Sequence, residues 1–229
     1  MENNNFVKYK DLLTIKDYDQ KTNNEEFVFL PLEDEFVIGK YTEKINMLEF
    51  GEKIPVRKTV YLKLLKVAKK LKEINSNYKL VVVYGFRDMS KQVKYFNELY
   101  ISAKEKFDNE LDLLEYIHEK IAVPEVSGHP TGGAVDIIIY NSDTKKYLNF
   151  GSDVLDYSTT QCYYYNENIS DEAILNRKML RNLMIEQEFA PYDGEWWHFS
   201  YGDKEWAFFY KKEKALYNQM KIKDVFKSC

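Results

Sequence analysis

Cysteine and long apolar runs are scarce in this 229-residue chain, and each scarcity excludes a class of protein. Cys162 and Cys229 are too few for a disulfide framework, so we expect two free thiols in a reducing compartment. No run of apolar residues approaches the ~20 needed to cross a bilayer. The first residues, 1–8, lack the positive-then-apolar order of a secretory signal. These features predict a cytoplasmic protein without a membrane span.

A strong excess of charge of one sign is also missing. The chain has 33 Lys and Arg against 37 Asp and Glu, a formal net charge of -4, so we expect no nucleic-acid partner. Apolar residues make up 45% of the chain, which is enough for a sizeable core. No Pro-, Gly- or Ser-rich linker divides the sequence. We therefore expect a single domain over residues 1–229.

Glycine is rare, yet three of the nine glycines lie within the segment Ser127-Gly-His-Pro-Thr-Gly-Gly133. Such a concentration predicts a tightly turned loop whose backbone closely approaches another group. The next run, 134–140, is rich in β-branched residues and predicts a buried strand. Asp136 enters this strand, and a buried carboxylate needs a cation or hydrogen-bond donors. A metal ion would satisfy that need.

Histidine is rarer still, and two of the three histidines lie in this loop and in the later run Glu195-Trp-Trp-His198. His129, Asp136 and His198 offer two imidazoles and a carboxylate. A catalytic zinc ion takes three such ligands and leaves the fourth position to water. The metal lowers the pKa of that water, and a nearby carboxylate such as Glu195 can take its proton. The sequence thus predicts one Zn²⁺ per chain, with Glu195 as the base.

The spacing of Glu195 and His198 poses a geometric problem. The run 196–201 has strand character, and residues three apart in a regular strand point to opposite faces. We therefore expect Glu195 at the entrance of the strand, where an irregular backbone turns its carboxylate toward the metal. The alternative is that Glu195 is a surface residue beside a packed strand.

Together the two segments resemble those of the D-alanyl-D-alanine dipeptidases, zinc metallopeptidases that include the vancomycin-resistance dipeptidases. That family's pattern is Ser-x-His-x6-Asp followed by Glu-x-x-His, usually within Glu-Trp-Trp-His-Phe. The matching residues here are Ser127, His129, Asp136 and the run from Glu195 to Phe199. The resemblance implies hydrolysis of D-Ala-D-Ala, or a similar small dipeptide substrate, by metal-activated water. It covers roughly residues 60 to 210.

The family also has an arginine after an early strand, and here Arg87 follows the apolar run 79–84. By that match Arg87 faces the developing oxyanion, where a fixed and always protonated cation lowers the barrier. The alternative is a surface ion pair with Asp88.

The resemblance further implies an acidic residue, some twenty positions beyond Asp136, that holds the free amine of the substrate. Asp153 and Asp156 lie in that region, but the spacing from Gly151 departs from the family's, so one of the two serves or neither does; Asp156 is our candidate for substrate binding. Ser127 either hydrogen-bonds the substrate or caps its loop.

Helices are expected at 61–74 and at 171–187, the second capped by Ser170, and strands at 79–84 and at the two motif segments. His118 lies on an apolar face of another expected helix and reads as structural. With the resemblance, this predicts an α+β fold in which a small antiparallel sheet, flanked by helices, carries the zinc site. Residues 1–60 match the family poorly and would roof the site, restricting it to small substrates.

Two other functions stay open. A D,D- or L,D-carboxypeptidase or endolysin acting on cell-wall peptides shares the two ligand elements, although the Trp-Trp-His-Phe version favours the dipeptidases. A zinc-containing binding module without catalysis is the other, and the presence of Glu195 and Arg87 argues against it.

Overall fold

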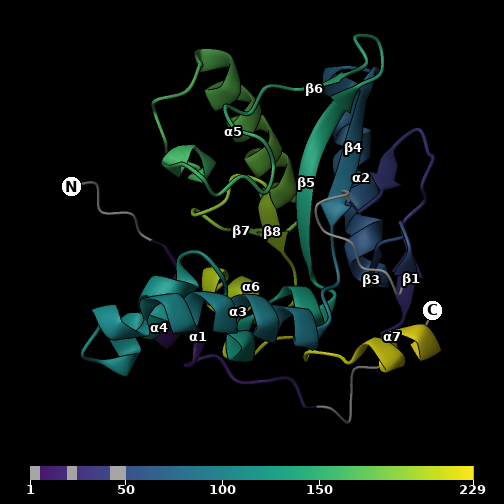
Figure 1. The fold of residues 1–229 in the computed structure, drawn as a ribbon. Helices are drawn as coiled ribbons and strands as arrows, with labels where there is room; N and C mark the ends of the chain where they lie inside the picture. The colour runs from purple at the N-terminus through teal and green to yellow at the C-terminus, as the bar shows by residue number, and fades with distance from the viewer. Residues whose placement is uncertain (1–5, 20–24, 42–49, 229) are drawn as a thin grey trace.

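The structure is a computed structural model that describes residues 6–19, 25–41 and 50–228. Its centre is a six-stranded sheet in the order β2-β4-β5-β8-β7, with β6 paired to β5 outside that path (Figure 1). The strands of this sheet are β2 (Val37–Gly39), β4 (Tyr78–Tyr84), β5 (Ala134–Asn141), β6 (Lys146–Tyr147), β7 (Ala190–Pro191) and β8 (His198–Ser200). With helices on both sides of it, the fold is α+β, as the sequence predicts.

The sheet is mixed, which corrects the expectation of a small antiparallel one. Strands β4, β5, β8 and β7 pair antiparallel, but β2 runs parallel to β4, with Val37 opposite Leu80. A parallel pair needs a crossover connection, and α2 (Lys58–Ile74) lies in it. The three residues of β2 give no periodic signal that identifies their partner strand, so the parallel edge was missed.

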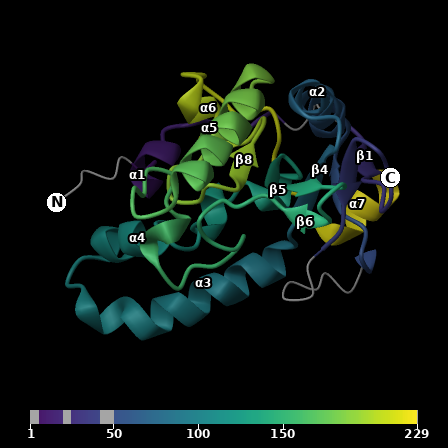
Figure 2. The same cartoon turned by 90° about the horizontal axis from the view of Figure 1, so that it is seen from above.

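The two long helices α2 and α5 (Asp171–Glu186) lie on one side of the sheet, whereas α3 (Met89–Ala103) and α4 (Glu110–His118) lie on the other (Figure 2). Helix α2 buries an apolar stripe at helical spacing, formed by Val60, Leu64, Val67, Ala68 and Leu71. Helix α5 starts at Ser170, whose hydroxyl accepts the Ala173 N–H at 3.2 Å. Both helices were predicted.

The short elements surround this frame. A separate two-stranded antiparallel sheet pairs β1 (Phe27–Phe29) with β3 (Pro55–Arg57). The short helices are α1 (Tyr9–Leu12), α6 (Lys204–Phe209) and α7 (Ile222–Ser228). Among the described residues, no helix is both long and apolar enough to span a membrane.

One hydrophobic cluster joins distant parts of the chain. It includes Phe27 of β1, the buried faces of β4 and β5, and Val225 of α7. The N-terminal segment also reaches the region of the second motif, because the Phe6 ring packs against Tyr192 with centroids 6.0 Å apart. Residues 1–5, 20–24 and 42–49 lie outside the described part of the chain, so roofing of the site by residues 1–60 stays a prediction.

Candidate active site

Three buried side chains converge where β5 pairs with β8. Donor atoms of His129, Asp136 and His198 all lie within 4.8 Å of one another. Asp136 on β5 stands directly opposite His198 on β8 in the register. His129 comes from a single 3-10 turn, His129–Thr131, that ends at Gly132 with a φ of 76° before β5 begins. The antiparallel pairing thus brings together two segments that are distant in sequence.

Asp136 lies between the two imidazoles. Its Oδ2 is 3.5 Å from His129 Nε2, and its Oδ1 is 3.0 Å from His198 Nδ1. The remaining nitrogen of each ring has its own partner. His129 Nδ1 lies 2.8 Å from the carbonyl oxygen of Gly85, and His198 Nε2 lies 3.6 Å from Glu205 Oε2. Each imidazole is therefore oriented with one nitrogen toward Asp136.

The two histidines differ in their electrostatics. Burial, reinforced by the nearby charge of Arg87, lowers the pKa of His129 to about 3 although Asp136 opposes this. Burial also disfavours the charged form of His198, but its contacts with Asp136 and Glu205 outweigh burial and raise its pKa well above the usual value. Burial alone would raise the pKa of Asp136, yet the two imidazoles hold it below the usual value.

The donor set fits a zinc ion. Asp136 is 1% exposed, and a carboxylate so deeply buried is costly without a cation beside it. Zinc prefers imidazole nitrogen and carboxylate oxygen, and three protein ligands leave one position for water. The residues that would hold it are His129 through Nε2, Asp136 through its carboxylate and His198 through Nδ1.

Glu195 lies beside this triad because the chain turns before β8. The Glu195 N–H donates to the carbonyl of Tyr192 at 3.3 Å, and the His198 N–H donates to the carbonyl of Glu195 at 3.2 Å. The expected strand from 196 begins only at His198. The turn brings Glu195 Oε2 to 4.0 Å from His198 Nδ1. Burial raises the pKa of Glu195 to about 7, against the opposing charge of His198.

Arg87 follows β4 and is held by neutral groups. Its Nε donates to the hydroxyl of Tyr84 at 3.1 Å, and its Nη1 donates to Gln92 Oε1 at 2.8 Å. Its charge lies close enough to Asp136 to influence the titration of that carboxyl. Asp88 instead caps α3 by accepting the Ser90 N–H at 2.9 Å. The guanidinium is thus positioned beside the triad rather than paired at the surface with Asp88.

The residues predicted to contact the substrate, Ser127 and Asp156, are not members of the triad. The Ser127 hydroxyl is buried, and no described residue hydrogen-bonds to it. Asp156 is half-buried and accepts the Ser158 N–H at 2.9 Å, whereas Asp153 is exposed. The chain turns sharply between them, where Leu155 has a φ of 62°. The assignment of Ser127 and Asp156 to substrate binding stays a prediction.

Two residues near the triad were missed by sequence reasoning. Half of the surface of Tyr157 is exposed, but its hydroxyl lies close to Glu195, Asp136 and Arg87, and desolvation there with the two negative charges raises its pKa well above the usual value. Its ring packs edge-on against Trp197, with centroids 5.5 Å apart. Glu205, on α6, faces the second nitrogen of His198. Neither residue belongs to a spacing pattern, since irregular segments connect both to the motif strands.

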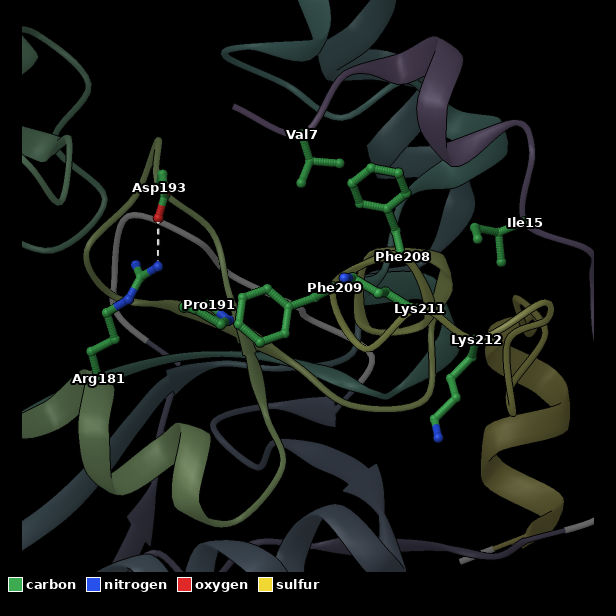
Figure 3. A pocket seen from close by; sticks show the side chains of 9 residues that line it. All are labelled: Val7, Ile15, Arg181, Pro191, Asp193, Phe208, Phe209, Lys211 and Lys212. Atoms are coloured by element: carbon green, nitrogen blue, oxygen red, sulfur yellow. Dashed lines mark ion pairs between the residues drawn. The ribbon is translucent and has the colours of Figure 1, made fainter. Parts of the chain in front are cut away.

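A separate pocket of about 510 Å³ lies between α1, α5 and α6 (Figure 3). Apolar side chains such as Phe208 and Phe209 line it together with the ion pair between Arg181 and Asp193, whose charged atoms are 2.7 Å apart. No predicted site residue lines this pocket. The triad lies outside this pocket, where β5 pairs with β8.

The site combines two imidazoles and a carboxylate with a second carboxylate, Glu195, that can act as a base. This combination is typical of metal-dependent hydrolases. The family model of the M15 peptidases, described as D-Ala-D-Ala dipeptidase, matches residues 38–220, and the chain belongs to this family. Peptidases of this family are zinc-dependent.

Individual relatives match only part of the chain, at about 30% identity. A D-alanyl-D-alanine dipeptidase of Enterococcus faecium is 32% identical over 101 residues, covering 44% of this chain and 49% of the relative. Another, from Synechocystis, is 29% identical over 94 residues, covering 37% and 38%. The matches thus span half or less of the length of these relatives. Among solved structures, the alignment with the LD-carboxypeptidase LdcB covers 90% of this chain and 80% of the LdcB chain, with a TM-score of 0.44 and 17% identity.

Proposed function

We propose that this protein is a zinc-dependent dipeptidase that hydrolyses D-Ala-D-Ala or a similar small dipeptide. The observation that carries the proposal is the buried group of His129, Asp136 and His198 within 4.8 Å, with Glu195 beside it. The substrate class is supported by the family model and by the Enterococcus faecium relative. Free dipeptides are soluble, which agrees with the cytoplasmic location expected from the sequence.

The residues divide the chemistry among them. A zinc ion held by the triad would polarise the scissile carbonyl and lower the pKa of water. Glu195, whose pKa burial raises to about 7, accepts a proton from that water and donates it to the leaving amine. The guanidinium of Arg87, oriented by Tyr84 and Gln92, stabilises the negative charge that develops on the former carbonyl oxygen.

The substrate amine is proposed to pair with a carboxylate. Asp156 is the better candidate because it is half-buried, whereas Asp153 is exposed. Ser127 offers a hydroxyl without a protein partner among the described residues, which suits a hydrogen bond to the substrate. An acylated amine is uncharged and cannot form this ion pair, so such a site binds longer or acylated peptides more weakly than the free dipeptide.

Substrate length tests this proposal. Free D-Ala-D-Ala should be cleaved with a kcat/KM about a hundredfold higher than N-acetyl-D-Ala-D-Ala or a pentapeptide stem, because only the free dipeptide has a charged amine to pair with the carboxylate, an interaction of a few kcal/mol. Activity should vanish on chelation and return with zinc. Equal cleavage of the acetylated dipeptide would reject the dipeptidase in favour of a carboxypeptidase. No cleavage of any of the three peptides by the zinc-loaded protein would favour a non-catalytic module.

Two variants serve as controls for the chemistry. Glu195→Gln should keep its zinc while kcat falls by several orders of magnitude, because the base is lost and the metal remains. Arg87→Lys should lower kcat more than it raises KM, since an ammonium does not reproduce the planar fork held by Tyr84 and Gln92. Near-normal turnover by Glu195→Gln would remove Glu195 from the mechanism.

A further inference from the structure

Glu205 contacts His198 at the ring nitrogen that does not face the triad. Its Oε2 lies 3.6 Å from His198 Nε2, while His198 Nδ1 lies 3.0 Å from Asp136 Oδ1. Both side chains are largely buried, with 10% of His198 and 15% of Glu205 exposed. Glu205 belongs to α6, which begins directly after Asp203 and a tight turn that follows β8. The short connection between β8 and α6 brings the Glu205 carboxylate back to His198 on β8.

The position of Glu205 matters for the tautomer of His198. A neutral imidazole has one nitrogen free to bind a metal, and the other carries the proton. Binding through Nδ1 therefore requires the proton on Nε2. A carboxylate beside Nε2 favours that arrangement and restrains the ring, as carboxylate partners of zinc-binding histidines do.

We propose that Glu205 is a positioning residue that holds His198 in the tautomer and orientation needed to bind zinc through Nδ1. The inference rests on the proposed zinc site. It concerns a residue outside the sequence pattern of the family, which ends at the motif containing Glu195 and His198.

The other surroundings of Glu205 do not account for its place. After burial, the charge of Glu205 is the largest cause that raises the pKa of Asp203 to about 6, so these two carboxyl groups repel each other. The charge of Glu205 also acts on His118, but burial outweighs it and lowers the pKa of that histidine, whose Nδ1 accepts the Val123 N–H at 3.3 Å. Glu205 Oε1 is buried, and no described residue hydrogen-bonds to it. The attractive contact that remains is the one with His198.

Another reading is that Glu205 stabilises α6 as an acidic residue in its first turn, where it would interact with the helix dipole. Two substitutions separate the readings. Glu205→Gln keeps the length of the side chain but removes its charge. Glu205→Asp keeps the charge in the first turn but withdraws the carboxylate from Nε2 by one methylene. Glu172→Gln, which removes an exposed first-turn acid of α5, is the matched control.

The experiment measures the zinc dissociation constant of each purified full-length variant by competition with a fluorescent chelator, and the melting temperature of each metal-free form. We expect zinc to bind Glu205→Gln about 10- to 100-fold and Glu205→Asp about tenfold more weakly than the wild type. Glu172→Gln should keep the wild-type dissociation constant.

Wild-type zinc affinity in either Glu205 variant overturns the inference, as does an equal loss in Glu172→Gln. If Glu205→Gln does not fold, Glu205→Asp decides by the same measurement. Absence of zinc binding by the wild-type protein would instead reject the proposed zinc site, and the inference with it. Failure of the inference alone is therefore distinguishable from failure of the proposed function.

Discussion

The two histidines of the site have the same proposed task in opposite surroundings. His129 is held by the main chain, through the Gly85 carbonyl at 2.8 Å, and burial lowers its pKa to about 3. His198 lies between the carboxylates of Asp136 and Glu205, whose contacts raise its pKa well above the usual value despite burial. At neutral pH and without metal, we therefore expect a neutral His129 and a protonated, charged His198.

The two histidines thus differ in whether they must lose a proton before they bind a cation. The His129 side is ready to bind metal, because its free nitrogen needs no proton loss. On the His198 side, the carboxylates of Asp136 and Glu205 stabilise the charged imidazole, so His198 has to lose a proton before it binds metal. Carboxylate side chains orient His198, whereas a main-chain carbonyl orients His129. The two histidines should therefore respond differently to substitutions around them.

The largest expected effect comes from removing each histidine. Both His129→Ala and His198→Ala should lose zinc and activity, since two protein ligands rarely retain a catalytic zinc. Their metal-free forms should differ in stability. At pH about 6, His198→Ala should cost about 3 kcal/mol or more by leaving two buried carboxylates unpaired, and His129→Ala about 1–2 kcal/mol.

The sign of the pH dependence follows from the raised pKa of His198. The stability contributed by its charged form is fully present below the ordinary pKa of 6.5 and is lost as the pH rises through the raised value in the folded protein. The difference between the two variants should therefore shrink in alkaline buffer. Thermal unfolding of the metal-free proteins over a pH series measures it, and equal costs at low pH would contradict the contrast.

Proton release on zinc binding is the next largest effect. Ligands must be deprotonated to bind, and His198 is the protonated one in the metal-free protein at pH 7. We expect about one proton released per zinc from His198, with a further fraction from Glu195, whose pKa is about 7. Zinc affinity should accordingly rise with pH. Calorimetry in buffers of different ionisation enthalpy counts the protons, and none released at pH 7 would mean that His198 is already neutral.

A glycine substitution tests the backbone-held half. A Cβ at Gly85 would come 2.4 Å from Ile54 Cγ2, so Gly85→Ala has to displace Ile54 or the main chain whose carbonyl orients His129. We expect a loss of about 1–3 kcal/mol in stability together with about tenfold weaker zinc binding. Gly39→Ala is the matched control, because its Cβ would meet Leu30 at 2.3 Å, and β2 pairs with neither β5 nor β8. Equal zinc affinity in both variants would show that the Gly85 carbonyl does not matter for binding.

The smallest expected effect concerns Cys162. Its thiol is buried, and burial raises its pKa to about 11, so it is a poor metal ligand at neutral pH. Cys162→Ala should bind one zinc with unchanged affinity and lose about 1 kcal/mol of stability. Metal analysis and thermal unfolding check this. Loss of zinc from Cys162→Ala would identify Cys162 as a fourth protein ligand. Zinc binding would then not depend on the triad alone.

Much of the site could be read from the sequence because its signals are local. The glycine-rich turn and the β-branched run predict a loop that enters a buried strand, and the structure has both at His129 and β5. The irregular entrance expected for Glu195 is a turn, because β8 starts only at His198. The glycine cluster, the β-branched run and the small number of histidines were sufficient for these expectations. Cys229 lies outside the described residues, so its free thiol stays a prediction.

Other features depend on contacts between segments far apart in the chain. The parallel edge formed by β2 was missed because three residues carry no information about which strand they join. The approach of Glu205 to His198, and of the Tyr157 hydroxyl to Arg87, depends on irregular connections that have no period. Residue types, local patterns and the family resemblance thus predicted three residues that lie together in the structure, and the hydrolase class. The pairing of β5 with β8 decided which atoms meet, because a sheet register is set by packing across the whole core.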